Sequence, residues 1–112
     1  MKYTIDVTQE DIDHGHRSSC LSCPVARAVG RALAADYPDA MAHCGPWNLR
    51  MVGEDARFGE GDGIVTLAFA HTPPSVRHFM RDFDAGDAEH LTPFSFTVDF
   101  KDLNPNALRN IC

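Results

Sequence analysis

Hydrophobic and polar residues alternate in two stretches of this sequence, and each alternation predicts a β-strand. In residues 2–7 the apolar side chains are Tyr3, Ile5 and Val7, with polar residues between them. In residues 93–100 every second position is Phe or Val. Successive side chains of a strand point to opposite faces of a sheet, so a period of two gathers the apolar set on one face. We expect both strands to be packed on one side only.

The middle of the chain shows less regular strand patterns. Residues 41–44 are strand-like, and residues 47–51 alternate apolar and polar side chains. Residues 64–69 form a further apolar run, separated from these by the acidic, glycine-rich segment 59–63. Glycine tolerates the backbone conformations of turns. The simplest arrangement is a β-hairpin over residues 47–70 with a long tip.

A C-x-x-C-P motif at residues 20–24 begins the main predicted helix, which is expected to run from Cys23 to Asp36. Proline suits the first helical position because its missing N–H has no partner there, so Ser22 or Cys23 should be the N-cap. Apolar residues then recur at helical spacing. The stripe consists of Val25, Ala28, Val29, Ala32 and Leu33.

Two further helical segments are predicted. Thr8, with Asp11 three residues later, is a relative of the capping box and predicts a short helical turn over residues 9–14. A second long helix is expected from Pro73 to Asp84, with Thr72 as its N-cap.

These elements predict an α+β fold with one mostly antiparallel sheet of four to five strands and the two main helices on one face. A chain of 112 residues suffices for one modest core. We expect a single domain over residues 1–103 and a loosely held C-terminal tail over 104–112.

Composition and charge restrict the class of protein. Sixteen acidic residues against ten basic ones give a formal net charge of −6, which argues against a nucleic-acid binder because phosphate contacts require clustered Lys and Arg. No apolar run is long enough to span a membrane, and Asp6 interrupts the first apolar stretch, so we expect a cytoplasmic protein. Arg27 and Arg31 lie four apart on the main helix, on a face that is either solvated or beside an acidic neighbour.

The C-x-x-C motif admits three interpretations. A helix N-terminus stabilises a thiolate, which favours redox chemistry, but the strand before the motif ends too early for a thioredoxin-like βαβ unit. Structural zinc is an alternative, with Cys20, Cys23, His16 and Cys44 as ligands, although His43-Cys44 lacks the spacing of a zinc half-site. The favoured interpretation is that Cys20 and Cys23 are reduced residues that pack the helix start, with no cofactor.

The sequence contains no convergent catalytic set. It has no G-x-S-x-G nucleophile motif, and the glycines of residues 59–63 lack the Lys and Ser or Thr of a phosphate-binding loop. We therefore expect a non-enzymatic protein.

Acidic side chains gather in two short segments, which predicts an acidic surface complementary to a basic partner protein. The candidate partner-binding residues are Glu54, Asp55, Glu60 and Asp62 in the first segment and Asp84, Asp87 and Glu89 in the second.

Several short motifs resemble a group of small uncharacterised phage and prophage proteins. They are V-T-Q-E-D-I at residues 7–12, C-x-x-C-P-V-A at 20–26, F-D-x-G at 83–86 and P-F-x-F at 93–96. The resemblance implies a phage accessory protein that acts in the bacterial cytoplasm. Combined with the acidic charge, it favours a protein-binding module that inhibits a host protein with a basic surface, as anti-CRISPR proteins do. The alternative is a small thiol-redox or zinc module built on Cys20 and Cys23.

Overall fold

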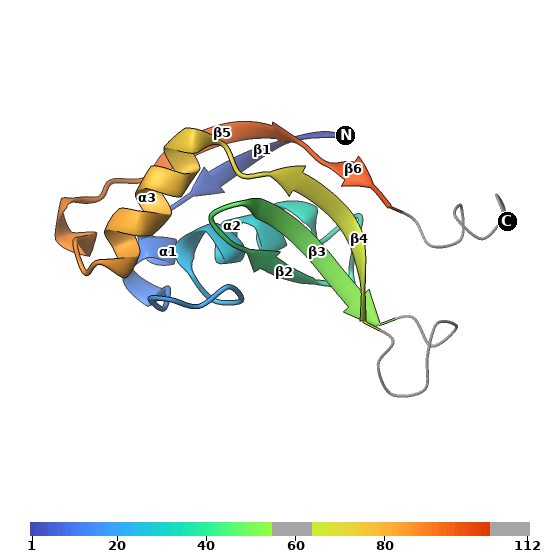
Figure 1. The fold of residues 1–112 in the computed structure, drawn as a ribbon, viewed down its shortest axis with the longest axis horizontal. Coiled ribbons are helices and arrows are strands. Elements are labelled where there is room, and N and C mark those ends of the chain that lie inside the picture. The colour runs from blue at the N-terminus through green and yellow to red at the C-terminus, as the bar shows by residue number, and fades with distance from the viewer. Residues whose placement is uncertain (55–63, 104–112) are drawn as a thin grey trace, which may run out of the picture.

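A computed structural model describes residues 1–54 and 64–103 of the chain, and it confirms the α+β class (Figure 1). The predicted tail, the hairpin tip and, with it, Asp55, Glu60 and Asp62 lie outside the described residues. The helices are α1 (Gln9–His14), α2 (Pro24–Leu33) and α3 (Pro74–Asp84), with a 3₁₀ turn, η1 (Ala88–His90). The strands are β1 (Lys2–Val7), β2 (Met41–Cys44), β3 (Asn48–Glu54), β4 (Ile64–His71), β5 (Phe94–Asp99) and β6 (Lys101–Asp102).

The strands form two antiparallel sheets where the sequence predicted one. β1 pairs with β5, and the second sheet has the order β2-β3-β4-β6. Phe100 joins the two sheets, because β5 ends just before it and β6, which pairs with β4, begins just after it. Its side chain is fully buried, and its N–H donates to the carbonyl of Met1 at 2.8 Å. The chain therefore pairs with β1 before Phe100 and with β4 after it. This change of partner divides the expected single sheet into two.

The alternating stretches have the faces that were predicted. Ile5 and Val7 of β1 and Val98 of β5 are buried, while the residues between them are exposed. The hairpin of β3 and β4 is also present, with a register shift between Met51 and Val52. Period-two patterning therefore identified both the strands and their buried sides.

Helix α2 packs inside the curve of the strands and contacts both β1 and β2 (Figure 1). Its stripe is the centre of the core: Val25 and Val29 are fully buried. The helix ends at Leu33, three residues earlier than expected, and the N–H groups of Asp36 and Tyr37 donate to the Leu33 carbonyl in the turn that follows. Gly30 of α2 faces β2, where a Cβ on it would lie 3.6 Å from the Cβ of Ala42.

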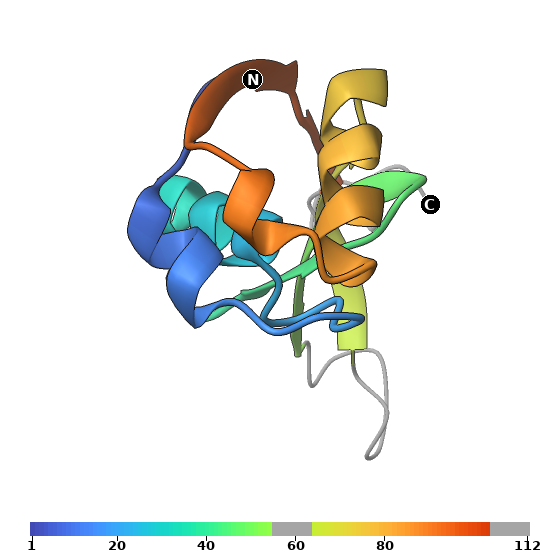
Figure 2. The ribbon, with the colours of Figure 1, turned by 90° about the vertical axis from the view of Figure 1, so that its left-hand side faces the viewer.

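Helix α3 stands apart from α2 at one end of the molecule (Figure 2). Phe79 packs against Phe94 of β5, with ring centroids 4.7 Å apart. The sequence predicted Thr72 as the N-cap of α3, but the N-cap is Pro73. The Thr72 hydroxyl instead donates to the Gly45 carbonyl at 2.7 Å, which ties the start of α3 to the turn after β2.

Candidate functional site

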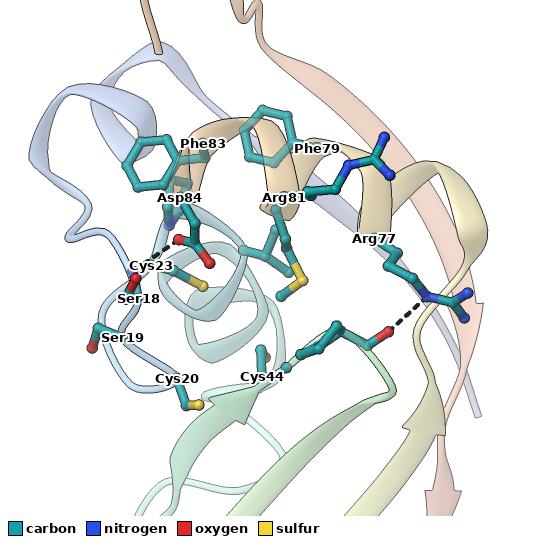
Figure 3. Close-up of a pocket in the computed structure, with 15 residues that line it drawn as sticks. Ser18, Ser19, Cys20, Cys23, Cys44, Arg77, Phe79, Arg81, Phe83 and Asp84 are labelled. Atoms are coloured by element: carbon teal, nitrogen blue, oxygen red, sulfur yellow. Dashed lines mark hydrogen bonds between the residues drawn. The ribbon is translucent and has the colours of Figure 1, made fainter. Parts of the chain in front are cut away.

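A pocket of about 460 Å³ lies between α3, the start of α2 and the end of β2 (Figure 3). Three segments that are distant in sequence build it: residues 18–25, residues 44–46 and residues 77–84. Its walls include Val25, Met80 and Phe83, which are all buried. The volume falls within the range of about 300–1,000 Å³ that is typical of ligand pockets.

Three cysteines line this pocket. Cys20 is exposed, whereas Cys23 and Cys44 have only 6% and 2% of their surface accessible. Cys20 lies beside both: the Cys44 N–H donates to the Cys20 carbonyl at 2.8 Å, and Cys20 and Cys23 share the turn closed by the Cys23 N–H bond to Ser19. Burial raises the pKa of the Cys23 thiol and of the Cys44 thiol, so both are protonated at neutral pH.

Cys23 also begins α2. It is the N-cap, and its Sγ accepts a hydrogen bond from the Ala26 N–H at 3.4 Å. Of the two N-cap candidates, the structure selects Cys23, and Pro24 follows at the first helical position as expected. The Cys23 thiol thus replaces the hydroxyl or carboxylate that usually satisfies this N–H.

The loop that carries Cys20 is held in a defined shape. Ser18 has a positive φ of 55°, and its N–H donates to the Asp84 carboxylate of α3 at 2.8 Å. The hydroxyls of Ser19 and Ser22 are hydrogen-bonded at 2.8 Å. A Ser in the left-handed region carries strain that the surrounding contacts must hold. The loop is therefore anchored to α3 at the mouth of the pocket.

Two exposed apolar side chains, Trp47 and Leu21, follow pocket-lining residues directly in the sequence. Trp47 is 68% exposed, and the Arg77 guanidinium lies 4.7 Å from the centroid of its ring. Arg77 also donates to the Pro46 carbonyl at 2.9 Å, which holds the turn against α3 (Figure 3). Leu21, beside Cys20, is also exposed. Trp exposed to this degree and fixed by a cation–π contact is typical of a protein-binding surface.

The predicted acidic surface is only partly assembled. Asp84, Asp87 and Glu89 are exposed at the C-terminal end of α3, and Asp84 borders the pocket. Glu54 is the last residue of β3, and that end of β3 lies at the opposite end of the molecule from α3 (Figure 1). The acidic surface as a whole stays a prediction.

A buried carboxylate elsewhere accounts for the two arginines of α2. Asp11 is fully buried and accepts from Arg31 at 2.7 and 3.0 Å and from Arg27 at 3.3 Å. Thr8 and Asp11 complete a reciprocal capping box. Burial alone would raise the pKa of this carboxyl, but the bonds from Arg31 and Thr8 outweigh it and hold the pKa at about 2. Of the two environments expected for the arginines, the acidic neighbour is the one found.

The described residues, 1–54 and 64–103, contain no group of three or more His, Cys, Asp or Glu side chains that is placed to hold a metal ion. The zinc ligands considered from the sequence are therefore not arranged as a metal site, although Cys20, Cys23 and Cys44 share the pocket. The arrangement also differs from a thioredoxin motif, because α1 follows β1 and separates that strand from the cysteines.

Comparison with protein-family models, curated protein sequences and solved structures gave no match for this chain. In the part of the chain that the structure describes, no helix has both the length and the apolar character needed to cross a membrane.

Sequence reasoning located Cys20, Cys23 and Asp84 but missed Met80 and the role of Trp47. Met80 belongs to the apolar stripe of α3, and such stripes usually indicate core packing. The one available signal for Trp47 was its position directly after Gly45-Pro46, since a large aromatic residue at a turn is often exposed.

Proposed function

We propose that this chain is a non-enzymatic protein-binding module that takes one apolar side chain of its partner into the pocket beneath α3. The observation that carries the proposal is an apolar pocket of about 460 Å³ together with the exposed Trp47, which follows the pocket-lining Pro46 and contacts the pocket-lining Arg77. Pockets that receive an anchoring side chain, with an aromatic residue at the rim, are common at the centres of protein interfaces.

The chemistry of the walls supports an apolar anchor. Val25, Met80 and Phe83 supply carbon and thioether surface, and the Cys23 and Cys44 thiols are weak hydrogen-bonding groups. In Figure 3 the guanidinium groups of Arg77 and Arg81 point away from the pocket. An anionic ligand group would therefore lose its hydration without gaining a cationic partner inside, whereas Leu, Met or an aromatic side chain would gain contact area.

The acidic residues favour a basic partner residue at one side of the pocket. Asp84, Asp87 and Glu89 are exposed where α3 ends, so a Lys or Arg next to the anchor would meet complementary charge. Such rim contacts raise the association rate more than they raise the affinity. The partner surface we propose therefore carries an apolar side chain flanked by basic residues.

The resemblance to phage proteins extends this proposal to the kind of partner. A host protein with a basic surface, inhibited by occupation of that surface, fits both the acidic residues near the pocket and the overall charge of −6. This part of the proposal rests on the sequence motifs and on charge, and it stays a prediction.

A matched pair of surface variants tests the proposal. Trp47→Ser removes the exposed aromatic that follows the pocket-lining Pro46, and Met41→Ser removes a 57% exposed apolar side chain at the far end of β2. The tagged wild-type chain and both variants are used to capture proteins from a bacterial lysate, and the binding constant of any captured protein is then measured directly. We expect Trp47→Ser to weaken binding by at least tenfold and Met41→Ser to leave it within twofold.

Equal effects of the two substitutions would contradict the pocket as the binding site. Circular dichroism of both variants serves as the folding control. A charge-neutral version of the α3 end, Asp87→Asn with Glu89→Gln, should slow association at low salt and have little effect at high salt.

A further inference from the structure

Cys20 is an exposed cysteine, and two buried cysteines, Cys23 and Cys44, lie near it. It lies at the mouth of the pocket, in the loop that Ser18 and Asp84 anchor to α3. The Cys23 N–H bond to the Ser19 carbonyl, at 3.2 Å, closes a turn that includes Cys20 and Cys23. The Cα atoms of residues three apart in a turn lie within about 7 Å, and a disulfide spans Cα separations of about 4.4–6.8 Å. In Figure 3 the two side chains do not point toward each other, so both must rotate before the bond can form.

We propose that Cys20 is an oxidation site at which a hydroperoxide converts the Cys20–Cys23 dithiol into a reversible disulfide. The site is a modification site of the pocket rim and does not depend on the proposed partner. It requires a peroxide that reaches the exposed Cys20, and a second thiol that is present beside it and sheltered from solvent.

The chemistry balances in two steps. The Cys20 thiolate attacks one peroxide oxygen, so an S–O bond forms, the O–O bond breaks, and the other oxygen leaves as an alcohol or as water after protonation. The Cys23 sulfur then attacks the sulfur of the Cys20 sulfenic acid, so the S–S bond forms, the S–O bond breaks, and water leaves with the Cys23 proton. The peroxide gains the two electrons that the thiol pair loses.

Burial assigns the two roles. Cys23 is nearly inaccessible, and burial raises its thiol pKa, so it reacts slowly with peroxide in solution. Cys20 is exposed, and reactivity toward oxidants follows access as well as thiolate content. Cys23 is therefore the resolving thiol and Cys20 the one attacked first.

Cys44 is a less suitable second thiol despite its backbone bond to Cys20. The Cys44 N–H that reaches Cys20 points sideways from β2, along the hydrogen-bonding direction of the sheet. A strand side chain stands perpendicular to that direction, and Cys44, like Ala42, faces the core. Cys20 thus lies beside the edge of β2, in a different direction from the one in which the Cys44 side chain points.

Thiol counting in a defined set of variants tests the assignment. Cys112 lies outside the described residues, so all proteins carry Cys112→Ser and retain three thiols. Each protein is treated with hydrogen peroxide, its free thiols are alkylated, and the products are mapped by peptide mass spectrometry before and after dithiothreitol. We expect the background protein to lose two thiols reversibly, with a Cys20–Cys23 cross-linked peptide.

Three further variants separate the outcomes. Cys44→Ser should still lose two thiols, Cys20→Ser should form no disulfide, and Cys23→Ser, which keeps an N-cap acceptor, should retain a sulfenic acid at Cys20 that dimedone traps. In the oxidised protein the Ala26 amide resonance should shift, because Cys23 Sγ leaves that N–H. A Cys20–Cys44 peptide, a disulfide in Cys23→Ser, or no thiol loss under conditions that oxidise free cysteine would each overturn the proposal.

Discussion

The backbone N–H of Ser18 donates to Oδ1 of Asp84 at 2.8 Å and so joins the loop before α2 to the last turn of α3. Ser18 has a positive φ, which this contact helps to hold. We expect Asp84→Ala to speed hydrogen exchange of the Ser18 amide by about three- to tenfold, the range of one hydrogen bond. Asp84→Asn keeps an acceptor oxygen and should show a smaller effect. Equal exchange rates in all three proteins would contradict the contact.

The buried Asp11 should dominate the acid sensitivity of the fold. Its pKa of about 2 lies below the ordinary value of 3.8, so its stabilising contribution is complete above pH 3.8 and is lost as the pH falls toward 2. This contribution is about 2 kcal/mol. Asp11→Asn should lower the unfolding free energy at pH 7 by about 3 kcal/mol, because Arg27 and Arg31 lose their carboxylate.

The measurement is urea unfolding between pH 2 and pH 7. Below pH 4, Asp11→Asn should make the unfolding free energy depend less steeply on pH. Asp39→Asn, at an exposed Asp, should leave this pH dependence unchanged. A steep acid transition that persists in Asp11→Asn would assign the sensitivity to other carboxyls.

Gly15 and Gly45 form a matched pair for a steric test. A Cβ on Gly15 would lie 2.7 Å from both the Asp11 carbonyl and the Pro24 ring, while a Cβ on Gly45 would meet nothing within 4 Å. Gly15→Ala should therefore cost about 1–3 kcal/mol, the range found for overpacking. Gly45→Ala should be neutral or stabilising by up to about 1 kcal/mol, because it reduces the freedom of the unfolded chain. Thermal unfolding of both variants checks the order.

Cys20 and Cys23 should respond differently to truncation. Cys23→Ala removes a buried side chain and the acceptor for the Ala26 N–H, so we expect a loss of about 1–3 kcal/mol. Cys20→Ala at an exposed position should stay within about 0.5 kcal/mol. Reduced conditions keep disulfide formation out of the comparison. A loss at Cys20 equal to that at Cys23 would show that the loop, and not the cap, carries the stability.

The pocket should bind small apolar probes. Indole, a mimic of a Trp side chain, is titrated into protein with labelled methionine methyl groups. The Met80 methyl, which borders the pocket, should shift with saturation in the millimolar range, and the exposed Met41 methyl should not. Equal, unsaturated shifts at both positions would indicate contact with the surface only.

The elements of this fold could be predicted from local patterns, since each carries its own signal. The period of two identified β1 and β5, and the proline after Cys23 identified the start of α2. The division into two sheets had no such signal, because Phe100 continues the alternation of β5 even though its neighbours pair with different strands.

The candidate site was less predictable because tertiary packing builds it. Cys20 and Cys44 are brought together by a backbone bond between a loop and an edge strand, and no spacing in the sequence encodes that bond. An acidic neighbour was one of the two environments predicted for Arg27 and Arg31. The capping-box pattern at Thr8 and Asp11, however, does not indicate that Asp11 is buried. Thr72 is not the cap because α3 begins one residue later than predicted, with Pro73 at the N-cap, and the Thr72 hydroxyl donates to the Gly45 carbonyl.

The pairing of β1 with β5 has a consequence for synthesis on the ribosome. Lys2 lies opposite Asp99 and Val7 opposite Phe94, so β1 has no pairing partner until nearly all of the described chain has been made. During that interval β1, which contacts α2, is not held in a sheet. Contacts this distant in sequence form slowly, so the domain is expected to acquire its structure late and in one step, and a stalled, shortened chain should expose the apolar face of α2 to chaperones and proteases.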